Sequence, residues 1–432
     1  MQKNKKLFIR LQLQLILFLT LLTFLQVASA FEWEERSRDQ FGTVFSYFIY
    51  PIAIDIPGLG TSSGLGASIL NMNETDLDFT GFVLRGDFDV TGGTFLNYHI
   101  IKNRLLFDIG FYDFEAAIVR YDRGINSNKD SYILPRLNGK FIESQLTWTF
   151  YERHLEAFVK LGLGEQQVTQ VLNNKDEQFD TIDSSVQDQV VTKLGFRFDN
   201  TNDRIDPIQG YRLETALNIP NNSDPFISDF VVADYNATLY LPFRKRDTLV
   251  FNLFRSDAYV TNQVDAEFDT LQKERGLDCD NSFPVDTPAW QACKTTEADA
   301  LNQMLAANAH GTATSLGGTQ RLRSFANGRY YAGHSMFWGV EYRWNLNDVR
   351  KPFDFYIAKG IRTGLQVAIF AEQGSVSERS SDLFDTLKTS YGVGFRIVLE
   401  GVILRIDYSD GSEGQEAVLF IDYPWSLTSI DS

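Results

Sequence analysis

The chain has 432 residues, of which 44% are hydrophobic and 14% aromatic, and its formal net charge is −16. This acidic balance makes nucleic acid a poor partner, because like charges repel. Beyond the first thirty residues there is no long apolar run, which excludes a bundle of membrane-spanning helices. A transmembrane β-barrel stays possible, because its strands need only about 9 to 11 residues and expose every second one to lipid.

Residues 1–30 have the pattern of a secretory signal peptide. Basic residues within 3–10 precede an apolar run over 15–25, and the small residues at 28–30 close the segment. This pattern predicts cleavage before Phe31. The apolar run is shorter than the about 20 residues that a transmembrane anchor needs. We therefore expect the chain to be exported.

Residues 31–62 are predicted to form an entry segment with a possible first strand, and residues 63–432 to form the barrel. At the boundary, Gly60-Thr61-Ser62-Ser63-Gly64 matches the Gly-x-Ser-x-Gly pattern of a hydrolase nucleophile. That motif requires a strand, a sharp turn and a helix, and no helical pattern follows here. We interpret the segment as a glycine-rich turn. A hydrolase that uses Ser62 is the less favoured alternative.

Strands are predicted from the alternation of apolar and polar residues. Over 335–345, small or charged residues alternate with large apolar ones, which is the period of two of a strand. The last strand places Tyr423 and Trp425 on its apolar face, whereas Arg396 and Arg405 lie on the polar face of the strands before it. In a soluble protein these arginines would point into the core. The pattern therefore predicts an apolar wall that faces lipid and a polar lumen.

The predicted connections alternate between short and long. The turns near Lys102, Glu152, Lys245 and Glu400 are short, and the loops 122–139, 172–188, 261–335 and 373–388 are long. Outer-membrane barrels sort their connections in this way, with short turns in the periplasm and long loops outside. The sequence therefore predicts an all-β fold, a transmembrane β-barrel of about sixteen antiparallel strands in the outer membrane of a Gram-negative bacterium.

Three motifs between residues 194 and 425 add a family resemblance. They are Leu322-Arg323-Ser324-Phe325, then Phe370-Ala371-Glu372-Gln373-Gly374, and a strand end with its turn that contains Asp199, Asp203, Arg204, Pro207 and Gly210. They resemble motifs of the bacterial surface antigen superfamily, which includes the Bam and Tam barrel-assembly proteins, the two-partner secretion transporters and the import barrels of mitochondria and chloroplasts.

The resemblance implies a lock inside the lumen. In this superfamily the long extracellular loop folds back into the barrel, so Arg323 at its tip is expected to pair with Glu372, and Phe325 and Gly374 complete the two motifs. The chain departs from the pattern twice, because Ser324 replaces a glycine and Glu372 replaces an aspartate. A guanidinium binds a carboxylate as a bidentate fork, and removing one partner leaves the other charge buried without its counterion.

Cys279 and Cys293 are the only cysteines and lie within loop 261–335. In an exported chain this arrangement predicts a disulfide. No histidine lies nearby, so we expect no metal site. Neither a phosphate loop nor a dinucleotide fingerprint is present, so we expect no cofactor.

The resemblance also implies a function, namely outer-membrane protein assembly and insertion or protein translocation, without enzymatic activity. Members of the superfamily usually carry periplasmic polypeptide-transport-associated (POTRA) domains ahead of the barrel. The interval after Phe31 is too short for one. We therefore expect a barrel-only member in outer-membrane lipid that works with a separate POTRA-type or chaperone partner on client membrane proteins. A passive channel or structural barrel is the alternative.

Overall fold

The computed structural model describes residues 33–37, 40–41, 44–173, 185–221, 224–244, 247–264, 267–276, 279–399 and 402–427. The predicted signal peptide, residues 1–30, lies outside these ranges. The chain divides into Met1–Glu35 and a compact unit, Arg36–Ser432. All elements named below belong to the second unit.

The described part of this unit forms one antiparallel sheet of sixteen long strands and the two-residue strand β6 (Arg120–Tyr121). The long strands are β1 (Ser46–Ile56), β2 (Gly60–Met72), β3 (Leu77–Gly86), β4 (Asp89–Ile101), β5 (Leu105–Ala117), β7 (Tyr132–Phe150), β8 (Leu155–Asn173), β9 (Val186–Thr201), β10 (Gly210–Pro220), β11 (Asp229–Pro242), β12 (Thr248–Asn262), β13 (His334–Phe355), β14 (Ala358–Ser377), β15 (Lys388–Leu399), β16 (Val402–Gly411) and β17 (Gly414–Ile421). The prediction of about sixteen antiparallel strands is confirmed.

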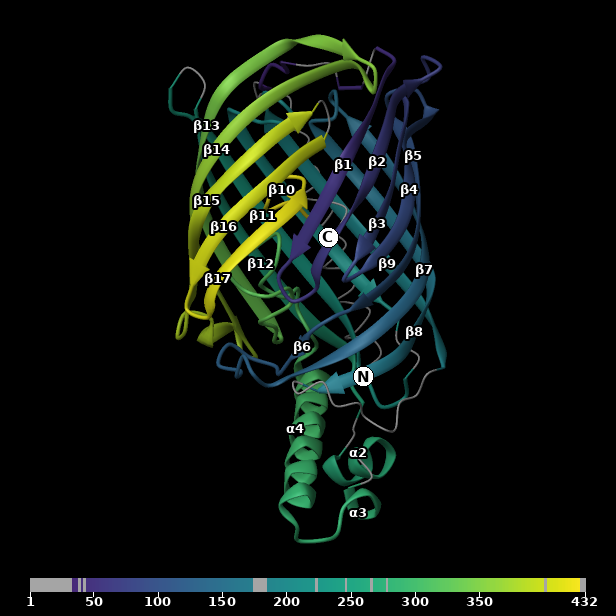
Figure 1. Cartoon of the computed structure of the whole chain (residues 1–432), viewed down its shortest axis with the longest axis vertical. Helices are drawn as coiled ribbons and strands as arrows, with labels where there is room; N and C mark the ends of the chain where they lie inside the picture. The colour runs from purple at the N-terminus through teal and green to yellow at the C-terminus, as the bar shows by residue number, and fades with distance from the viewer. Residues whose placement is uncertain are drawn as a thin grey trace, which may run out of the picture. The chain divides into compact units, whose positions relative to one another are not determined.

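The sheet closes on itself. Each long strand pairs with the next one along the chain, and β1 meets both β17 and β14 at the closure (Figure 1). Hairpins between sequence neighbours need only tight connections, which explains why all neighbouring strands are antiparallel. The predicted closed all-β barrel is therefore confirmed.

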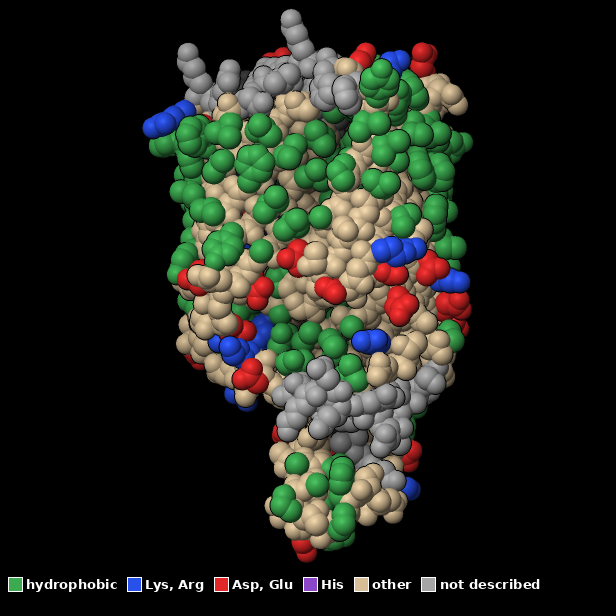
Figure 2. Space-filling model, in the orientation of Figure 1, with side chains coloured by type: hydrophobic (Ala, Val, Ile, Leu, Met, Phe, Trp, Pro, Cys, Tyr) green, Lys and Arg blue, Asp and Glu red, His purple; other side chains and the backbone are tan. Residues whose placement is uncertain are grey.

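The wall is apolar outside and polar inside. Along β13, Ser335 and Glu341 are fully buried, whereas Trp344 on the opposite face is 54% exposed. Hydrophobic side chains gather on the outer wall toward the upper end of the barrel in Figure 2, and charged ones lie mostly lower. An apolar outer band and a polar interior are the faces that a barrel in a bilayer requires.

The two ends of the barrel differ in their connections. Turns such as 102–104 and 151–154 lie at one end, here called the short-turn end, and the loop between β12 and β13 lies at the other. This loop includes the helices α2 (Phe268–Arg275), α3 (Cys279–Ser282) and α4 (Pro288–His310). The helices form an arm that projects from the barrel (Figure 1). Among the described residues, no helix is long and apolar enough to cross a membrane.

The start of the barrel lies within the predicted entry segment. The sheet begins at Ser46, inside the segment 31–62, which was expected to contain a possible first strand. The interpretation of Gly60 to Gly64 as a turn is wrong, because these residues belong to β2. A Cβ on Gly64 would lie 1.7 Å from the carbonyl oxygen of Val83, so this glycine permits close strand pairing.

The end of the barrel differs as well. β17 ends at Ile421, and Asp422 and Trp425 have positive φ angles of 96° and 76° that turn the chain away from the sheet. Tyr423 and Trp425 are 7% and 2% exposed. The prediction that these two aromatics lie on the outward face of the last strand is therefore wrong, because the chain turns inward before reaching them.

Candidate functional site: the plugged lumen

Residues 311–333, here called the plug, return from helix α4 to β13 through the inside of the barrel. α4 ends at His310, and the next residue, Gly311, has a φ of 67° that favours glycine. The plug and the wall share one buried apolar cluster, which contains Leu316, Leu322, Phe325, Tyr330, Ala332, Phe337, Val376 and Trp425. Leu316, Leu322, Phe325 and Tyr330 of the plug are buried in this cluster, and the hydrophobic effect favours that burial.

Arg323 at the tip of the plug is fully buried and binds three carboxylates. Its Nε lies 2.8 Å from Glu372 Oε1, and its Nη1 lies 3.1 Å from Glu341 Oε2 and 2.6 Å from Asp407 Oδ2. The backbone N–H of Arg323 also donates to Glu372. The contact with Glu372 is the one that the resemblance predicted. We call Arg323, Glu341, Glu372 and Asp407 the lock.

Aromatic rings and further arginines surround the lock. The guanidinium of Arg323 lies 3.4 Å from the ring centroid of Phe370, a cation–π contact. Arg343, Arg396 and Arg405 reach Glu341 or Asp407 from β13, β15 and β16. Four buried arginines thus meet three carboxylates. Removing one member would leave charges uncompensated in a buried site, which costs far more than losing a surface ion pair.

Ser324, which stands where the motif that it resembles has a glycine, is accommodated by a glycine of the wall. A Cβ on Gly411 would lie only 2.2 Å from the Oγ of Ser324, so this glycine leaves the space that the serine side chain occupies. Gly374 provides the same kind of space, because a Cβ there would lie 2.8 Å from Leu316 of the plug. The backbone N–H of Ser324 donates to Ser390 Oγ. The plug therefore packs closely against the wall at both motifs. At Ser324 the glycine that permits this packing is Gly411 of the wall, and not a residue of the plug.

The plug is also tied to loops at the end that carries the helical arm. Arg329 binds Glu413, in the turn between β16 and β17, through two contacts of 2.8 Å. Asn327 donates its backbone N–H to the carbonyl of Pro57. Arg123 binds Glu378 and the carbonyl of Gly311. The plug is thus held at both the tip and the rim.

The ion pair between Arg123 and Glu378, at the end of the barrel that carries the helical arm, should depend on pH. Burial tends to raise the pKa of Glu378, but the hydrogen bond and charge of Arg123 outweigh it and hold the pKa below its usual 4.5. A carboxyl with a lowered pKa stabilises the fold above its unfolded pKa and stops doing so as pH falls through the folded value. We expect protease cleavage of the plug rim to rise as pH is lowered from about 6 to 3. Glu378→Gln should lose that part of the pH dependence, and an unchanged profile would contradict the assignment.

A second ionic network lies near the short-turn end and includes the third motif. Arg204 donates to both oxygens of Glu156, at 2.6 and 3.2 Å, and Asp199 accepts from Arg212 and Arg36. Asp199 is fully buried. The motif residues Asp199 and Arg204 therefore bind different partners within one network and do not pair with each other.

The remaining motif residues shape the turn between β9 and β10. Asp203 accepts the backbone N–H groups of Ile205 and Asp206, and Pro207 is buried. Gly210 has a φ of 105°, and a Cβ there would lie 2.0 Å from the carbonyl oxygen of Asn200. Only glycine fits that position. The motif therefore fixes the course of the chain at the end of the lumen.

The C-terminal segment, Asp422–Leu427, lies inside the lumen as well. Trp425 Nε1 donates to Glu372 Oε1 of the lock at 3.1 Å. The Tyr423 hydroxyl lies 2.6 Å from Asp206 and 2.8 Å from Gln366. Sequence analysis missed this placement, and it also did not single out Glu341 or Asp407 as partners of Arg323.

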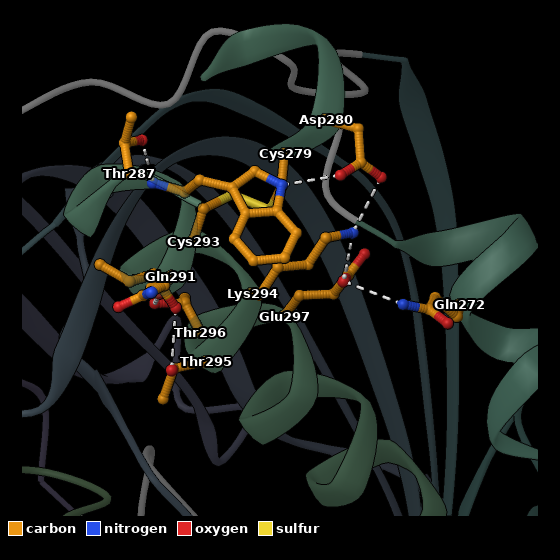
Figure 3. Close-up of a disulfide and its surroundings, with 12 residues drawn as sticks. Gln272, Cys279, Asp280, Thr287, Gln291, Cys293, Lys294, Thr295, Thr296 and Glu297 are labelled. Atoms are coloured by element: carbon orange, nitrogen blue, oxygen red, sulfur yellow. Dashed lines mark hydrogen bonds and ion pairs between the residues drawn. A yellow bond between two sulfur atoms is a disulfide. The ribbon is translucent and has the colours of Figure 1, made fainter. Parts of the chain in front are cut away.

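The helical arm is joined by the predicted disulfide. Cys279 of α3 and Cys293 of α4 are bonded, with Cα atoms 5.7 Å apart. Figure 3 shows Lys294 between Asp280 and Glu297, at 3.2 and 3.3 Å. Gln272 of α2 binds Glu297. The bridge and these polar contacts hold the three helices together.

Replacing both cysteines by serine is expected to loosen the arm and leave the barrel folded. Closing a loop of about 15 residues contributes about 3 kcal/mol in the chain-entropy model. Limited proteolysis should then cut within α2 to α4 while the heat-modifiable migration of the barrel in gels is unchanged. Equal protease resistance of the two proteins would contradict this role for the bridge.

Ser62, the alternative nucleophile, lies on β2 and is buried. Its Oγ donates to the carbonyl of Phe88 and accepts the backbone N–H of the same residue. A nucleophile elbow places its serine on a turn between a strand and a helix. That context is absent at Ser62, which is the third residue of the strand β2 and is followed by ten more strand residues.

The closure between β1 and β17 has the fewest register pairs of all junctions in the described sheet. The two strands share a single register pair, Asp55 with Leu419. By contrast, β16 and β17 pair continuously from Leu404–Ile421 to Gly411–Gly414. We call the β1–β17 junction the seam.

Comparisons with known proteins bear on the fold. No family model matches the sequence, and no curated protein matches it. CdiB from Escherichia coli has a similar structure, with a TM-score of 0.52, 9% identity, and coverage of 90% of this chain and 66% of that one. BamA from Haemophilus ducreyi lacking POTRA domains 1–3 matches with a TM-score of 0.46 and 12% identity, over 89% of this chain and 70% of the other. CdiB from Acinetobacter baumannii matches with a TM-score of 0.49 and 11% identity, over 87% of this chain and 59% of the other.

The chain is an outer-membrane β-barrel. Its closed sheet and its apolar outer wall are those of a Gram-negative outer-membrane protein. At such low identity the likeness to solved structures concerns the fold alone. The chain spans less than two thirds of each of the two CdiB chains.

Proposed function

We propose that this barrel inserts polypeptides into the outer membrane or translocates them, and that the seam is where it acts. The observation that carries the proposal is the single register pair between β1 and β17. An unpaired strand edge is a template for an incoming strand. The similarity of fold to CdiB from Escherichia coli is consistent with this role.

Apolar side chains hold the seam where backbone hydrogen bonds are few. Phe48, Tyr50 and Ile52 of β1 belong to a cluster against which Leu404 and Ile421 pack. The three side chains of β1 are 3–5% exposed, and their contacts carry no unsatisfied polar groups when they separate. Breaking a hydrogen-bonded ladder within a bilayer leaves backbone groups unsatisfied and costs more. The seam can therefore open more easily than any continuously paired junction.

The long β13–β14 hairpin supports the seam at the short-turn end. Ala358 and Lys359 of β14 pair with Phe48 and Tyr47 of β1, and the backbone N–H of Ile49 donates to the carbonyl of Ile357. Figure 1 shows this hairpin arching over the ends of β15 to β17 toward β1. The proposed opening would therefore begin between this hairpin contact and the register pair of Asp55 with Leu419.

Depletion of the protein in its own cells tests the proposal. We expect other β-barrel proteins, or surface polypeptides, to disappear from the outer membrane before growth stops, and a plasmid copy to restore them. Quantitative mass spectrometry of outer-membrane fractions provides the measurement. An unchanged outer-membrane proteome after full depletion would refute the proposed function.

A passive channel is the second candidate, because part of the lumen wall remains accessible. Lys160 and Glu143 form an ion pair of 2.8 Å on the inner faces of β8 and β7, and their side chains are 21% and 32% exposed. The lock residues, by contrast, are fully buried. Large and steady conductance of the purified barrel in planar bilayers would favour the channel.

We propose that a periplasmic partner, of POTRA or chaperone type, delivers the client. The partner would approach the short-turn end, where Tyr356 at the tip of the β13–β14 hairpin is 93% exposed. Affinity purification from detergent-solubilised membranes should recover this partner. Recovery of the barrel alone would count against a stable complex.

A further inference from the structure

The C-terminal segment is held in the lumen by side chains that bind its backbone. Asn236 Nδ2 donates to the carbonyl of Trp425 at 2.7 Å, and the N–H of Trp425 donates to Gln320 Oε1 at 2.8 Å. Lys193 Nζ donates to the carbonyl of Leu427 at 3.0 Å. The main-chain groups of two alternate residues are thus bound by side chains of β11, the plug and β9. Such contacts recognise a peptide backbone whatever its sequence.

A pocket for one indole adds sequence specificity. Trp425 Nε1 donates to Glu372, and its ring lies 6.1 Å from that of Phe337. Gly339 of β13 completes the pocket, because a Cβ there would lie 2.6 Å from Cζ2 of the tryptophan. A glycine at this inward-facing position leaves the space that the six-membered ring occupies. The pocket is therefore shaped for a large aromatic side chain with a hydrogen-bond donor.

The contacts named here are made by side chains and not by a β ladder. The segment is joined to the sheet through the end of β17 at Ile421. A second peptide with the same groups could therefore replace it without breaking any strand pairing. The tethered segment competes with such a peptide at an effective concentration of the order of millimolar.

We propose that this pocket is a polypeptide-binding site inside the lumen, which Tyr423–Leu427 occupies in the resting barrel. Its ligand is a segment of unfolded chain with a tryptophan followed two residues later by an aliphatic residue. This inference rests on the proposed function, because the natural ligand would be a segment of a client polypeptide. Displacement of the resting occupant also frees Glu372 from its tryptophan contact, which links ligand binding to the lock.

A labelled peptide tests the site without any client. The full-length barrel in detergent is titrated against a fluorescent peptide of residues 422–427, and fluorescence polarisation reports binding. We expect Trp425→Ala to bind the peptide at least tenfold more tightly than the unaltered protein, because the tethered tryptophan no longer competes. A peptide in which alanine replaces the tryptophan should bind at least tenfold more weakly to the same variant.

Two substitutions at glycines of the wall, one inside the pocket and one outside it, provide a matched comparison. In the Trp425→Ala protein, adding Gly339→Val should abolish binding, because the new side chain fills the indole pocket. Adding Gly364→Ala instead should leave binding unchanged, since a Cβ there meets Val398 at an ordinary 3.5 Å. Heat-modifiable migration in gels checks that each variant is folded. If Gly339→Val does not fold, the alanine-substituted peptide decides the question.

Equal peptide affinity of Trp425→Ala and the unaltered protein would overturn the proposal, as would equal affinity for the two peptides. The outcome is separable from that of the depletion experiment. Peptide binding together with an unchanged outer-membrane proteome would leave the site standing and remove the proposed function. Loss of client proteins without peptide binding would do the reverse.

Discussion

The Arg323→Ala variant is expected to release the plug and lose most of the activity. The substitution leaves Glu341, Glu372 and Asp407 buried with one fewer cation, and breaking a buried ion pair from one side costs about 3 to 5 kcal/mol. Arg343, Arg396 and Arg405 remain, but their own contacts are directed to Glu341 and Asp407. Glu372 is therefore the carboxylate left without a compensating charge, since in the described structure its ion pair is with Arg323.

Limited proteolysis of whole cells and thermal unfolding in detergent measure this loss. Cleavage within 311–333 should rise, the midpoint of unfolding should fall, and the variant should fail to restore client proteins after depletion. Arg379→Ala, at an exposed position in the next loop, is the matched control. A plug that resists protease as well as in the control would show that Arg323 does not hold it.

A double substitution separates charge from packing. Glu372→Gln keeps an acceptor for Trp425 and removes the charge that Arg323 neutralises. We expect Arg323→Ala with Glu372→Gln to be less destabilised than Arg323→Ala alone, because the stranded carboxylate is gone. Simple additivity of the two effects would mean that the residues do not interact energetically.

Sequence pattern predicted the wall of the barrel well because the bilayer imposes a strict rule on it. Apolar and polar residues must alternate along each strand, and short turns must lie at one end of the barrel and long loops at the other. Both signals are therefore repeated along the chain. The lock was predicted only in part. Arg323 and Glu372 were paired through the resemblance, whereas the approach of Glu341 and Asp407 depends on the register of the neighbouring strands β13 to β16, which brings their inward-facing side chains together.

The first strand was predicted without fixed boundaries and the end of the last strand was placed wrongly, and a proline lies at each. Pro51 leaves the boundaries of β1 open in the sequence, and a strand at an edge tolerates proline because one of its sides forms few ladder bonds. The seam is such an edge. Pro424 interrupts the alternation between Tyr423 and Trp425, and it was the available signal that β17 stops before them. The positive φ angles that turn the chain inward leave no comparable trace in the sequence.

Closing the seam with a disulfide is expected to abolish activity without unfolding the barrel. Asp55→Cys with Leu419→Cys places two cysteines at the single register pair of β1 and β17. Directly opposed residues of antiparallel strands have Cα atoms about 4.5 to 5.5 Å apart, within the range of a disulfide. If clients leave or enter through the seam, the oxidised variant cannot open and should not restore them after depletion, whereas added reductant should.

The matched control places the same bridge one junction away. Tyr408 and Ala417 oppose each other within the continuous β16–β17 ladder, so Tyr408→Cys with Ala417→Cys adds a bridge where no opening is proposed. This control also covers reduction of the bridge between Cys279 and Cys293, which any reductant will affect. Full activity of the oxidised seam variant would remove the seam from the mechanism. Inactivity of both variants would show that rigidity of the wall matters in general, because only a difference between the two junctions locates the opening at β1 and β17.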